Sequence, residues 1–168
     1  KIPTCGPGEV VNTYGRVAAT TLAAVDNMPV DGKLTASSPK GVSDGEIKLN
    51  IASGRVIISV KPTDKRKRVD LVLVLPERTN IRVETLAGAV DVGGNFASID
   101  AMTYTGTITT DVPTDDLNYH FLWTESKPRY IADFDIEKVK EKSAGRFEIK
   151  GKYAAPRPKP KVPSPTSD

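Results

Sequence analysis

Two copies of one sequence unit, at residues 79–92 and 99–112, constrain the fold of this chain more than any other feature. Each copy has alternating apolar residues, a Thr-x-x-Gly turn and a second alternating run, and the turn glycines Gly88 and Gly106 lie 18 residues apart. An alternation with a period of two places one set of side chains on each face of a β-strand, and glycine permits a tight turn. The repeat therefore predicts stacked strand–turn–strand units.

Weaker versions of the same turn occur at Gly15, Gly54 and Gly145. Thirteen glycines, thirteen prolines and abundant β-branched residues also fit an all-β fold with many turns. A step of 18 residues favours a β-solenoid or β-roll-like domain. The other spacings are irregular, so a sandwich-like arrangement of the same units is kept as the alternative.

The strands also have predicted faces. From Glu46 onward the alternation places Ile47, Leu49 and Ile51 inward, with Glu46 and Lys48 outward. Further inward residues are expected at Val56, Ile58 and Val60 and at Val69, Leu71, Leu73 and Leu75. A strand over 117–124 has Tyr119, Phe121 and Trp123 on one side. Residues 130–142 fit neither the helical nor the strand period.

The chain divides into three predicted segments. An extended lead-in occupies residues 1–9, a single all-β domain occupies 10–153 with its clearest repeats at 46–112, and a Pro/Lys-rich tail occupies 154–168. Alternating Pro and Lys cannot bury a core, so the tail is predicted to be a disordered tether to a further domain after residue 168. A ligand for an aromatic groove is the alternative.

The stretch 69–92 resembles the bacterial adhesin-like family of unknown function DUF4097, in which a hydrophobic strand ends in Leu-Pro and repeated Val-x-Thr-x-x-Gly-x-Val-x-Val units follow. The resemblance covers about residues 46–112, and the segment 12–17 looks like the opening strand of such domains. It implies a β-solenoid or β-roll fold in an extracytoplasmic bacterial protein, and no catalytic residues. Residues 129–151 and the tail resemble the region that precedes a von Willebrand type A module in some secreted bacterial proteins.

Charge and cysteine content narrow the function classes. A formal net charge of +3 is close to balanced and does not favour nucleic acid as a partner. No apolar run approaches the roughly 20 residues of a membrane helix, so no transmembrane segment is predicted. The single cysteine, Cys5, excludes an intramolecular disulfide. The first residue is Lys1 rather than Met, which suggests a fragment from which a signal or anchor has been removed.

Few residues could carry catalysis. His120 is the only histidine, and it would need a nucleophile and an orienting carboxylate supplied by the fold. A half-exposed residue of a sheet is the simpler interpretation. The sequence predicts no catalytic residue, no cofactor site and no metal site.

Calcium is the metal that the sequence leaves open. Five aspartates, Asp91, Asp100, Asp111, Asp115 and Asp116, lie on or after the repeat strands, and Asp133-x-Asp135 is a single further pair. Calcium requires six to eight oxygen ligands, and the regular calcium-loop motifs are absent. Surface solubility is the default explanation for these carboxylates.

Two other clusters have alternative interpretations. The basic segment 61–68 could contact anionic lipid, polysaccharide or phosphate, but a solvated loop that protects two very apolar strands from aggregation is favoured. Tyr119, Phe121 and Trp123 could stack on sugar rings, although three aromatics on one strand face usually belong to a core.

The sequence thus predicts a non-enzymatic, extracytoplasmic adhesin-like or interaction module of a bacterial surface or secreted protein, with an unidentified protein or glycan as its partner. A carbohydrate-active hydrolase or lyase built on a β-coil, or a purely structural spacer, is the alternative.

Overall fold

A computed structural model describes residues 8–26, 31–125 and 127–156. The chain separates into two compact units, residues 1–112 (unit 1) and 113–168 (unit 2), and each is described on its own. The sequence predicts one domain over 10–153. The division falls at Pro113, which has no backbone N–H to continue a strand ladder, and the acidic turn at Asp115 and Asp116 follows it.

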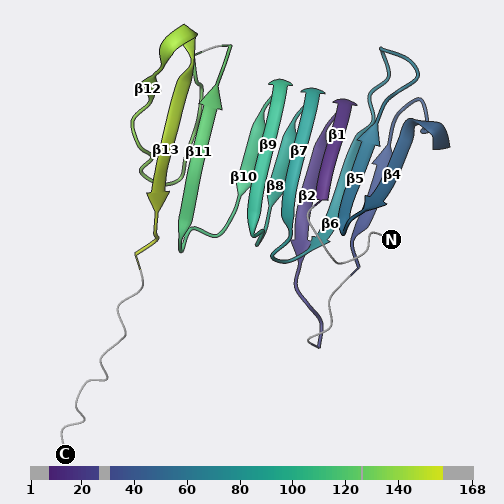
Figure 1. Ribbon diagram of the computed structural model, residues 1–168, viewed down its shortest axis with the longest axis horizontal. Helices are drawn as coiled ribbons and strands as arrows, with labels where there is room; N and C mark the ends of the chain where they lie inside the picture. Colours follow the sequence, from purple (N-terminus) through teal and green to yellow (C-terminus); the bar gives the residue numbers. More distant parts are fainter. Residues whose placement is uncertain (1–7, 27–30, 126, 157–168) are drawn as a thin grey trace, which may run out of the picture. The chain divides into compact units, whose positions relative to one another are not determined.

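Unit 1 contains two five-stranded sheets (Figure 1). Sheet 1 has the order β4-β5-β1-β7-β9, and sheet 2 has the order β10-β8-β2-β6-β3. The strands of unit 1 are β1 (Gly8–Tyr14), β2 (Val17–Leu22), β3 (Lys33–Ser37), β4 (Ile47–Ala52), β5 (Arg55–Val60), β6 (Asp70–Pro76), β7 (Asn80–Ala87), β8 (Val90–Gly93), β9 (Ser98–Thr105) and β10 (Ile108–Asp111). The all-β prediction is confirmed, and the described residues form no closed barrel.

Four pairs of successive strands each contribute one strand to each sheet. The pairs lie in the spatial order β5–β6, β1–β2, β7–β8 and β9–β10, and all their ladders are parallel. The pair β1–β2, which comes first in the chain, therefore lies between β5–β6 and β7–β8, which follow each other in the sequence. β4 and β3 add an antiparallel strand to each sheet, both at the β5–β6 end.

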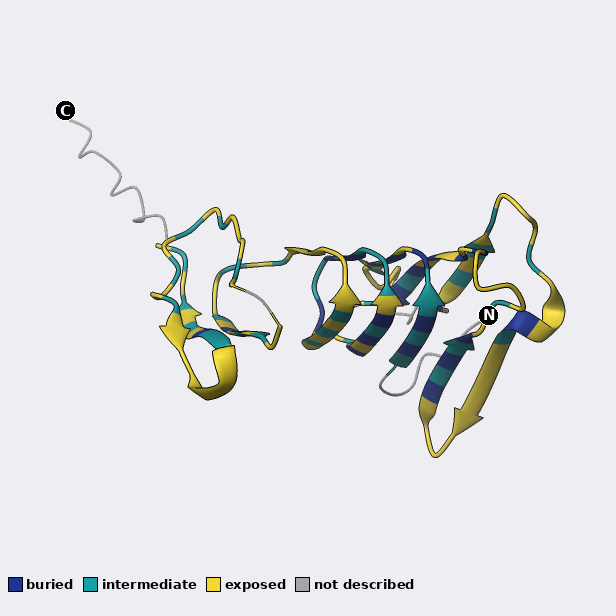
Figure 2. Cartoon of the chain, turned by 90° about the horizontal axis from the view of Figure 1, so that it is seen from above, coloured by how far each residue is buried: buried dark blue, intermediate teal, exposed yellow. Residues whose placement is uncertain are grey.

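The core of unit 1 is aliphatic and lies between the two sheets. Its side chains alternate along the strands, and Figure 2 shows the buried residues as dark blue bands between exposed ones. The predicted inward faces at Val56, Ile58, Val60 and at Val69, Leu71, Leu73, Leu75 are confirmed, with relative exposures of 5% or less. Burial of each such side chain contributes about 1.5–3 kcal/mol, and β-branched residues suit the pleated surface.

Three of the five turn glycines lie on one corner of unit 1. A Cβ on Gly88 would collide with the carbonyl oxygen of Gly15, and one on Gly106 would collide with that of Gly88. Gly15 also has a φ of +128°, a region that side chains disfavour. At Gly88 the reason for glycine is this close backbone approach and not a positive φ. Gly54 and Gly145 have open space around them and do not belong to this corner, so the predicted equivalence of all five glycines is wrong.

A row of polar side chains lies beside this corner, inside the core. Asn12, Thr85 and Thr103 are register partners on three neighbouring strands. Asn12 Nδ2 donates to the carbonyl of Val69 at 2.8 Å, and Thr85 Oγ1 lies 3.0 Å from Thr103 Oγ1. Thr103 Oγ1 in turn donates to the carbonyl of Gly88 at 3.1 Å. The threonine of the Thr-x-x-Gly unit thus supplies a partner for corner backbone groups in the core.

The register of β4 confirms the predicted inward face of Ile47, Leu49 and Ile51, but two of these side chains are not buried, and the predicted outward position of Glu46 is wrong. Leu49 and Ile51 are 47% and 52% exposed, whereas Glu46 is only 1% exposed. Leu49 is the register partner of the buried Ile58, so it does point to the inner face. However, β4 is the edge strand of sheet 1, where inner side chains have fewer neighbours. Glu46 precedes β4 in a short 3-10 turn (Asp44–Glu46), which aims its carboxylate inward.

Unit 2 is a three-stranded antiparallel sheet with the order β11-β13-β12, formed by β11 (Leu117–Trp123), β12 (Lys140–Glu141) and β13 (Phe147–Tyr153). The predicted strand over 117–124 is confirmed, and the ambiguous segment 130–142 contains only the short β12. A second 3-10 turn (Ser143–Gly145) precedes β13.

The ends of the predicted domain shift slightly. β1 begins at Gly8, inside the predicted lead-in, and residues 1–7 lie outside the described part. The same holds for residues 157–168 of the predicted tail; its described residues 154–156 have no regular structure.

Candidate functional site

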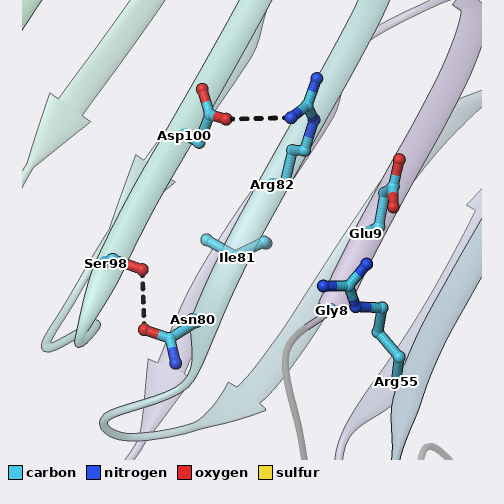
Figure 3. Close-up of a pocket in the computed structure, with 8 residues that line it drawn as sticks. All are labelled: Gly8, Glu9, Arg55, Asn80, Ile81, Arg82, Ser98 and Asp100. Carbon is cyan, nitrogen blue, oxygen red and sulfur yellow. Dashed lines mark hydrogen bonds and ion pairs between the residues drawn. The ribbon is translucent and has the colours of Figure 1, made fainter. Parts of the chain in front are cut away.

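The outer face of sheet 1 carries an open groove of about 210 Å³. It crosses the first residues of four strands, β5, β1, β7 and β9 (Figure 3). Four of its eight lining residues are charged; the lining consists of Gly8, Glu9, Arg55, Asn80, Ile81, Arg82, Ser98 and Asp100. The groove lies on rigid strands rather than on loops, so its side chains are held at fixed spacing.

Four charged side chains lie on four neighbouring strands of this groove. Glu9, Arg82 and Asp100 are register partners on β1, β7 and β9, and Arg55 begins the next strand, β5, two residues before Ile57, the register partner of Glu9. The sign of the charge therefore alternates across the sheet, from Arg55 to Glu9 to Arg82 to Asp100, and Figure 3 shows the four in this order. We call these four residues the charge row.

Local contacts fix one half of the row. Arg82 Nη1 lies 3.4 Å from an Asp100 carboxylate oxygen, and these side chains are 52% and 68% exposed. Ser98 Oγ donates to Asn80 Oδ1 at 2.7 Å and ties the same two strands together. Within the described residues, Glu9 and Arg55 have no ion-pair partner, so these two charges are available to a ligand.

Two residues of the row were recognisable in the sequence. Arg82 and Asp100 occupy equivalent polar positions in the alternating runs of the two repeats, 18 residues apart. Glu9 was assigned to the lead-in, and Arg55 was not singled out. No sequence signal could place β1 between β5 and β7, because these strands are distant from β1 along the chain.

The aspartates proposed for calcium are not brought together. Asp91 lies on sheet 2, where its carboxylate is 2.5 Å from Arg16 Nε, and Asp100 lies on sheet 1 beside Arg82. Asp111 ends β10, and Asp115 and Asp116 belong to unit 2. Within the described residues, no group of three or more His, Cys, Asp or Glu side chains is placed to hold a metal ion.

His120 is a half-exposed residue of the unit 2 sheet, as its simpler interpretation expects. Its Nε2 lies 2.9 Å from Glu148 Oε1, and Lys142 Nζ lies 2.9 Å from the other oxygen of the same carboxylate. The hydrogen bond from Lys142, and to a smaller extent that from His120, holds the pKa of Glu148 below its usual value. The carboxylate beside His120 is thus shared with a lysine in a surface ion-pair cluster.

The three aromatics of β11 belong to a longer row. Ring contacts of 5.6–6.3 Å connect Phe134 to Tyr119, Phe121, Trp123 and Tyr130 in succession, and Phe134 stacks on Tyr153 at 4.4 Å. Tyr119 is 7% exposed, and its hydroxyl oxygen accepts a hydrogen bond from the backbone N–H of Glu137 at 3.0 Å. Tyr119 is the one buried ring of this row; the other rings are partly buried, except Tyr130, which is 44% exposed.

The basic segment 61–68 is not uniformly solvated. Lys67 is only 6% exposed, and its Nζ lies 2.5 Å from Glu46 Oε2. The backbone N–H groups of Ser43 and Thr63 donate to the same carboxylate at 2.9 and 3.0 Å. These contacts, led by the hydrogen bond from Lys67, lower the pKa of Glu46 from 4.5 to about 2. Lys67 is therefore a structural residue, whereas Lys61, Lys65 and Arg66 are exposed.

No protein-family model matches this sequence, and no curated protein is similar to it. A solved structure, of a "putative cell adhesion protein" from Clostridium sporogenes, is similar with a TM-score of 0.37 and 17% sequence identity. The match covers 67% of this chain and spans 58% of that one. A likeness at this level carries no argument about fold or function, so the resemblance to DUF4097 and the link to a von Willebrand type A module stay predictions.

Proposed function

We propose that this chain is a non-enzymatic, adhesin-like interaction module, and that the outer face of sheet 1 is its interaction surface. The observation that carries this proposal is the charge row, which displays four alternating charges on four rigid strands. Arginine offers paired donors to carboxylates and to carbonyl oxygens, and carboxylates accept hydrogen bonds from hydroxyl and amide groups. A protein or glycan surface with spaced polar groups fits such a row.

The proposal includes a short β-solenoid as the scaffold of this face. Four strand pairs that each add one parallel strand to each sheet support it, and so does the corner shared by Gly15, Gly88 and Gly106. In such a stack each pair contacts only its neighbours, so an extended flat face is produced from few residues. That geometry suits display better than enclosure of a substrate.

An extracytoplasmic location belongs to the same proposal and rests on the sequence resemblance. None of the helices in the described part of the chain has the length and apolar character needed to cross a membrane. The Pro/Lys-rich segment 154–168 supports the function as a tether that would present the module at a distance from a further domain.

The test compares three proteins for binding to intact bacterial cells and to purified cell-wall polysaccharide. The row variant Glu9→Gln/Arg55→Gln/Arg82→Gln/Asp100→Asn removes all four charges, and the control Lys33→Gln/Asp111→Asn removes exposed charges from sheet 2. We expect wild type and control to bind and the row variant to lose at least about 10-fold in affinity.

Three outcomes contradict parts of this proposal. Binding that survives in the row variant would move the interaction surface elsewhere. Release of reducing ends or unsaturated sugars from the polysaccharide would favour the hydrolase or lyase alternative. Absence of binding in all three proteins to cells, polysaccharide and one another would favour a structural spacer.

A further inference from the structure

We infer that the connection between β5 and β6 is a second binding surface, and that it binds an anionic polysaccharide. This surface goes beyond the proposed function, because it shares no residue with the charge row. The observation that carries the inference is a buried carboxylate that fixes the connection while its cations stay exposed.

The buried carboxylate belongs to Glu46, which is 1% exposed. Its Oε1 accepts hydrogen bonds from the backbone N–H and the hydroxyl of Thr63, both at 3.0 Å, and its Oε2 accepts one from Lys67 Nζ at 2.5 Å. Thr63 and Lys67 lie on the two sides of a single turn, so one carboxylate holds both ends of that turn. We call these three residues the Glu46 clamp.

The turn itself is closed by Asp64. The backbone N–H of Lys67 donates to the carbonyl of Asp64 at 2.9 Å, and that of Arg66 donates to Asp64 Oδ1 at 2.8 Å. A bond from residue i+3 to residue i is typical of a β-turn, and an aspartate at the first position stabilises it. Lys65 and Arg66 are therefore the two central residues of a fixed turn, and both are exposed.

The contacts of this connection divide its charges into paired and unpaired ones. Residues 61–68 hold five cations and one anion. Lys67 is paired with Glu46, and Asp64 is paired with Lys40, whose Nζ lies 3.1 Å from a carboxylate oxygen. The remaining cations, which we call the turn cations, are exposed and have no ion-pair partner within the described residues: Lys61, Lys65, Arg66 and Arg68.

Protection of apolar strands from aggregation does not explain the Glu46 clamp. Exposed charges repel other chains in any arrangement, so a solvated loop would serve that purpose. Burial of an ion pair costs solvation free energy and requires good geometry. What the clamp adds is a fixed spacing of the turn cations, and fixed spacing is what recognition of a partner needs.

The chemistry of the connection indicates a polymer with many anionic groups. Exposed cations around a turn cannot enclose a small anion, and a single surface ion pair is weak, so several pairs have to form at once. Segment 61–69 is polar apart from Pro62 and the buried Val69, whereas stacking on bases uses aromatic side chains and binding to bilayers uses exposed apolar ones. A polysaccharide with carboxylate or sulfate groups along its chain fits this surface better than a nucleic acid or a membrane.

The experiment uses the full 168-residue chain and fluorescein-labelled heparin, a sulfated polysaccharide, with neutral dextran as the reference. Fluorescence anisotropy measures the affinity of wild type, of a turn variant and of a matched control. The turn variant is Lys61→Gln/Lys65→Gln/Arg66→Gln/Arg68→Gln, and the control Lys138→Gln/Lys140→Gln/Lys150→Gln/Lys152→Gln removes the same number of exposed cations from unit 2.

At roughly 50 mM salt we expect wild type to bind heparin and not dextran. The turn variant should lose at least about 10-fold in affinity, and the control should stay within about 2-fold of wild type. The affinity of wild type should fall steeply as the salt is raised to roughly 200 mM, because bound cations release the counterions of the polymer.

Glu46→Gln tests the Glu46 clamp separately. The change makes the net charge more positive, so an attraction that depends on net charge alone would strengthen. We expect a loss of at least about 3-fold in affinity instead, because the turn is no longer held at fixed spacing. Circular dichroism at the temperature of the titration checks that each variant is folded. An affinity of folded Glu46→Gln at or above that of wild type would show that the clamp does not position the turn cations.

Three other outcomes overturn the inference. The first is a wild type that does not bind heparin at roughly 50 mM salt, or a turn variant that binds as wild type does. The second is an equal loss in the unit 2 control, which would mean that net charge and not the turn decides binding. The third is tighter binding of wild type to single-stranded DNA, or to vesicles with about 30% phosphatidylserine, than to heparin. The row variant should bind heparin as wild type does, so this inference and the proposed function fail independently.

Discussion

Units 1 and 2 are both β-structures, but they are held together in different ways. Unit 1 pairs parallel strands that lie far apart in the chain, encloses an aliphatic core and brings backbone against backbone at its glycine corner. Unit 2 pairs antiparallel strands and carries a row of contacting aromatic rings, most of them partly buried. We conclude that unit 1 depends on the fit of its backbone, whereas unit 2 depends on the fit of its side chains.

The largest expected effect comes from Gly88→Val. The new side chain would collide with the carbonyl of Gly15, and relief requires two central strand pairs to move apart. We expect a loss of more than about 4 kcal/mol in the free energy of unfolding, or failure to fold. Gly106→Val should cost less, because β9–β10 is the outermost pair and can shift. Thermal melts unchanged in both variants would contradict the close approach. Gly45→Ala, at a position with open space, is the control and should melt as wild type does.

A second variant removes the cation of the buried Glu46–Lys67 ion pair of unit 1. Lys67→Met leaves the Glu46 carboxylate inside the protein without its cation, while Lys65→Met changes an exposed lysine of the same loop. We expect the first to lower the melting temperature by roughly 10 °C and the second by less than about 2 °C. Equal melting temperatures for the two variants would mean that the pair does not stabilise unit 1.

The Glu46–Lys67 ion pair also predicts that the free energy of unfolding of unit 1 depends on pH. The pKa of Glu46 is lowered in the folded state from 4.5 to about 2, so the stability that it contributes is fully present above about pH 4.5 and is lost as the pH falls through about 2. Denaturant titrations at several pH values should show this loss in wild type and a smaller one in Glu46→Gln. An identical acid response of the two proteins would contradict the assigned pKa.

Unit 2 should respond to the loss of a ring. Phe134 contacts Tyr119 and stacks on Tyr153, so Phe134→Ala removes two links of the aromatic row. We expect a loss of about 2–3 kcal/mol confined to unit 2, visible as faster amide hydrogen exchange in β11 and β13 and not in β7. Ile131→Ala is the control, because that side chain is 99% exposed. Equal protection of β11 and β13 in Phe134→Ala and wild type would show that the rings do not hold unit 2.

The smallest effect concerns the surface cluster of unit 2. Lys142→Gln and His120→Gln should each raise the pKa of Glu148 toward its usual value, and Lys142→Gln should raise it more. Carboxyl carbon NMR during a pH titration measures both shifts, with the melting temperature almost unchanged because the pair is near the surface. A larger pKa shift in His120→Gln than in Lys142→Gln would mean that His120 is the main partner of Glu148.

Much of the secondary structure could be predicted from the sequence, because the alternation of apolar residues reports directly on which face of a strand is buried. The strands around Val56–Val60, Val69–Leu75 and Leu117–Trp123 follow this rule. It failed at Glu46, whose burial depends on a cation 21 residues away. At Leu49 the face is right, but the side chain stays exposed because β4 is at a sheet edge.

The candidate site could be predicted only in part. Arg82 and Asp100 share a position in two similar repeats, which makes their proximity readable from the sequence. Glu9 and Arg55 join them only because β1 is inserted between β5 and β7.

The sequence by itself therefore determined the class of structure, the strand faces inside the repeats and the need for glycine at one corner. Only the tertiary structure decided the order in which the strand pairs stack, the role of Gly88 as a point of backbone contact and the alignment of the charge row. The physical reason is that every strand pair carries the same alternation of apolar residues, so this pattern does not specify which pairs become neighbours. The stacking order is selected by contacts between residues that are distant along the chain, such as Asn12 with the carbonyl of Val69.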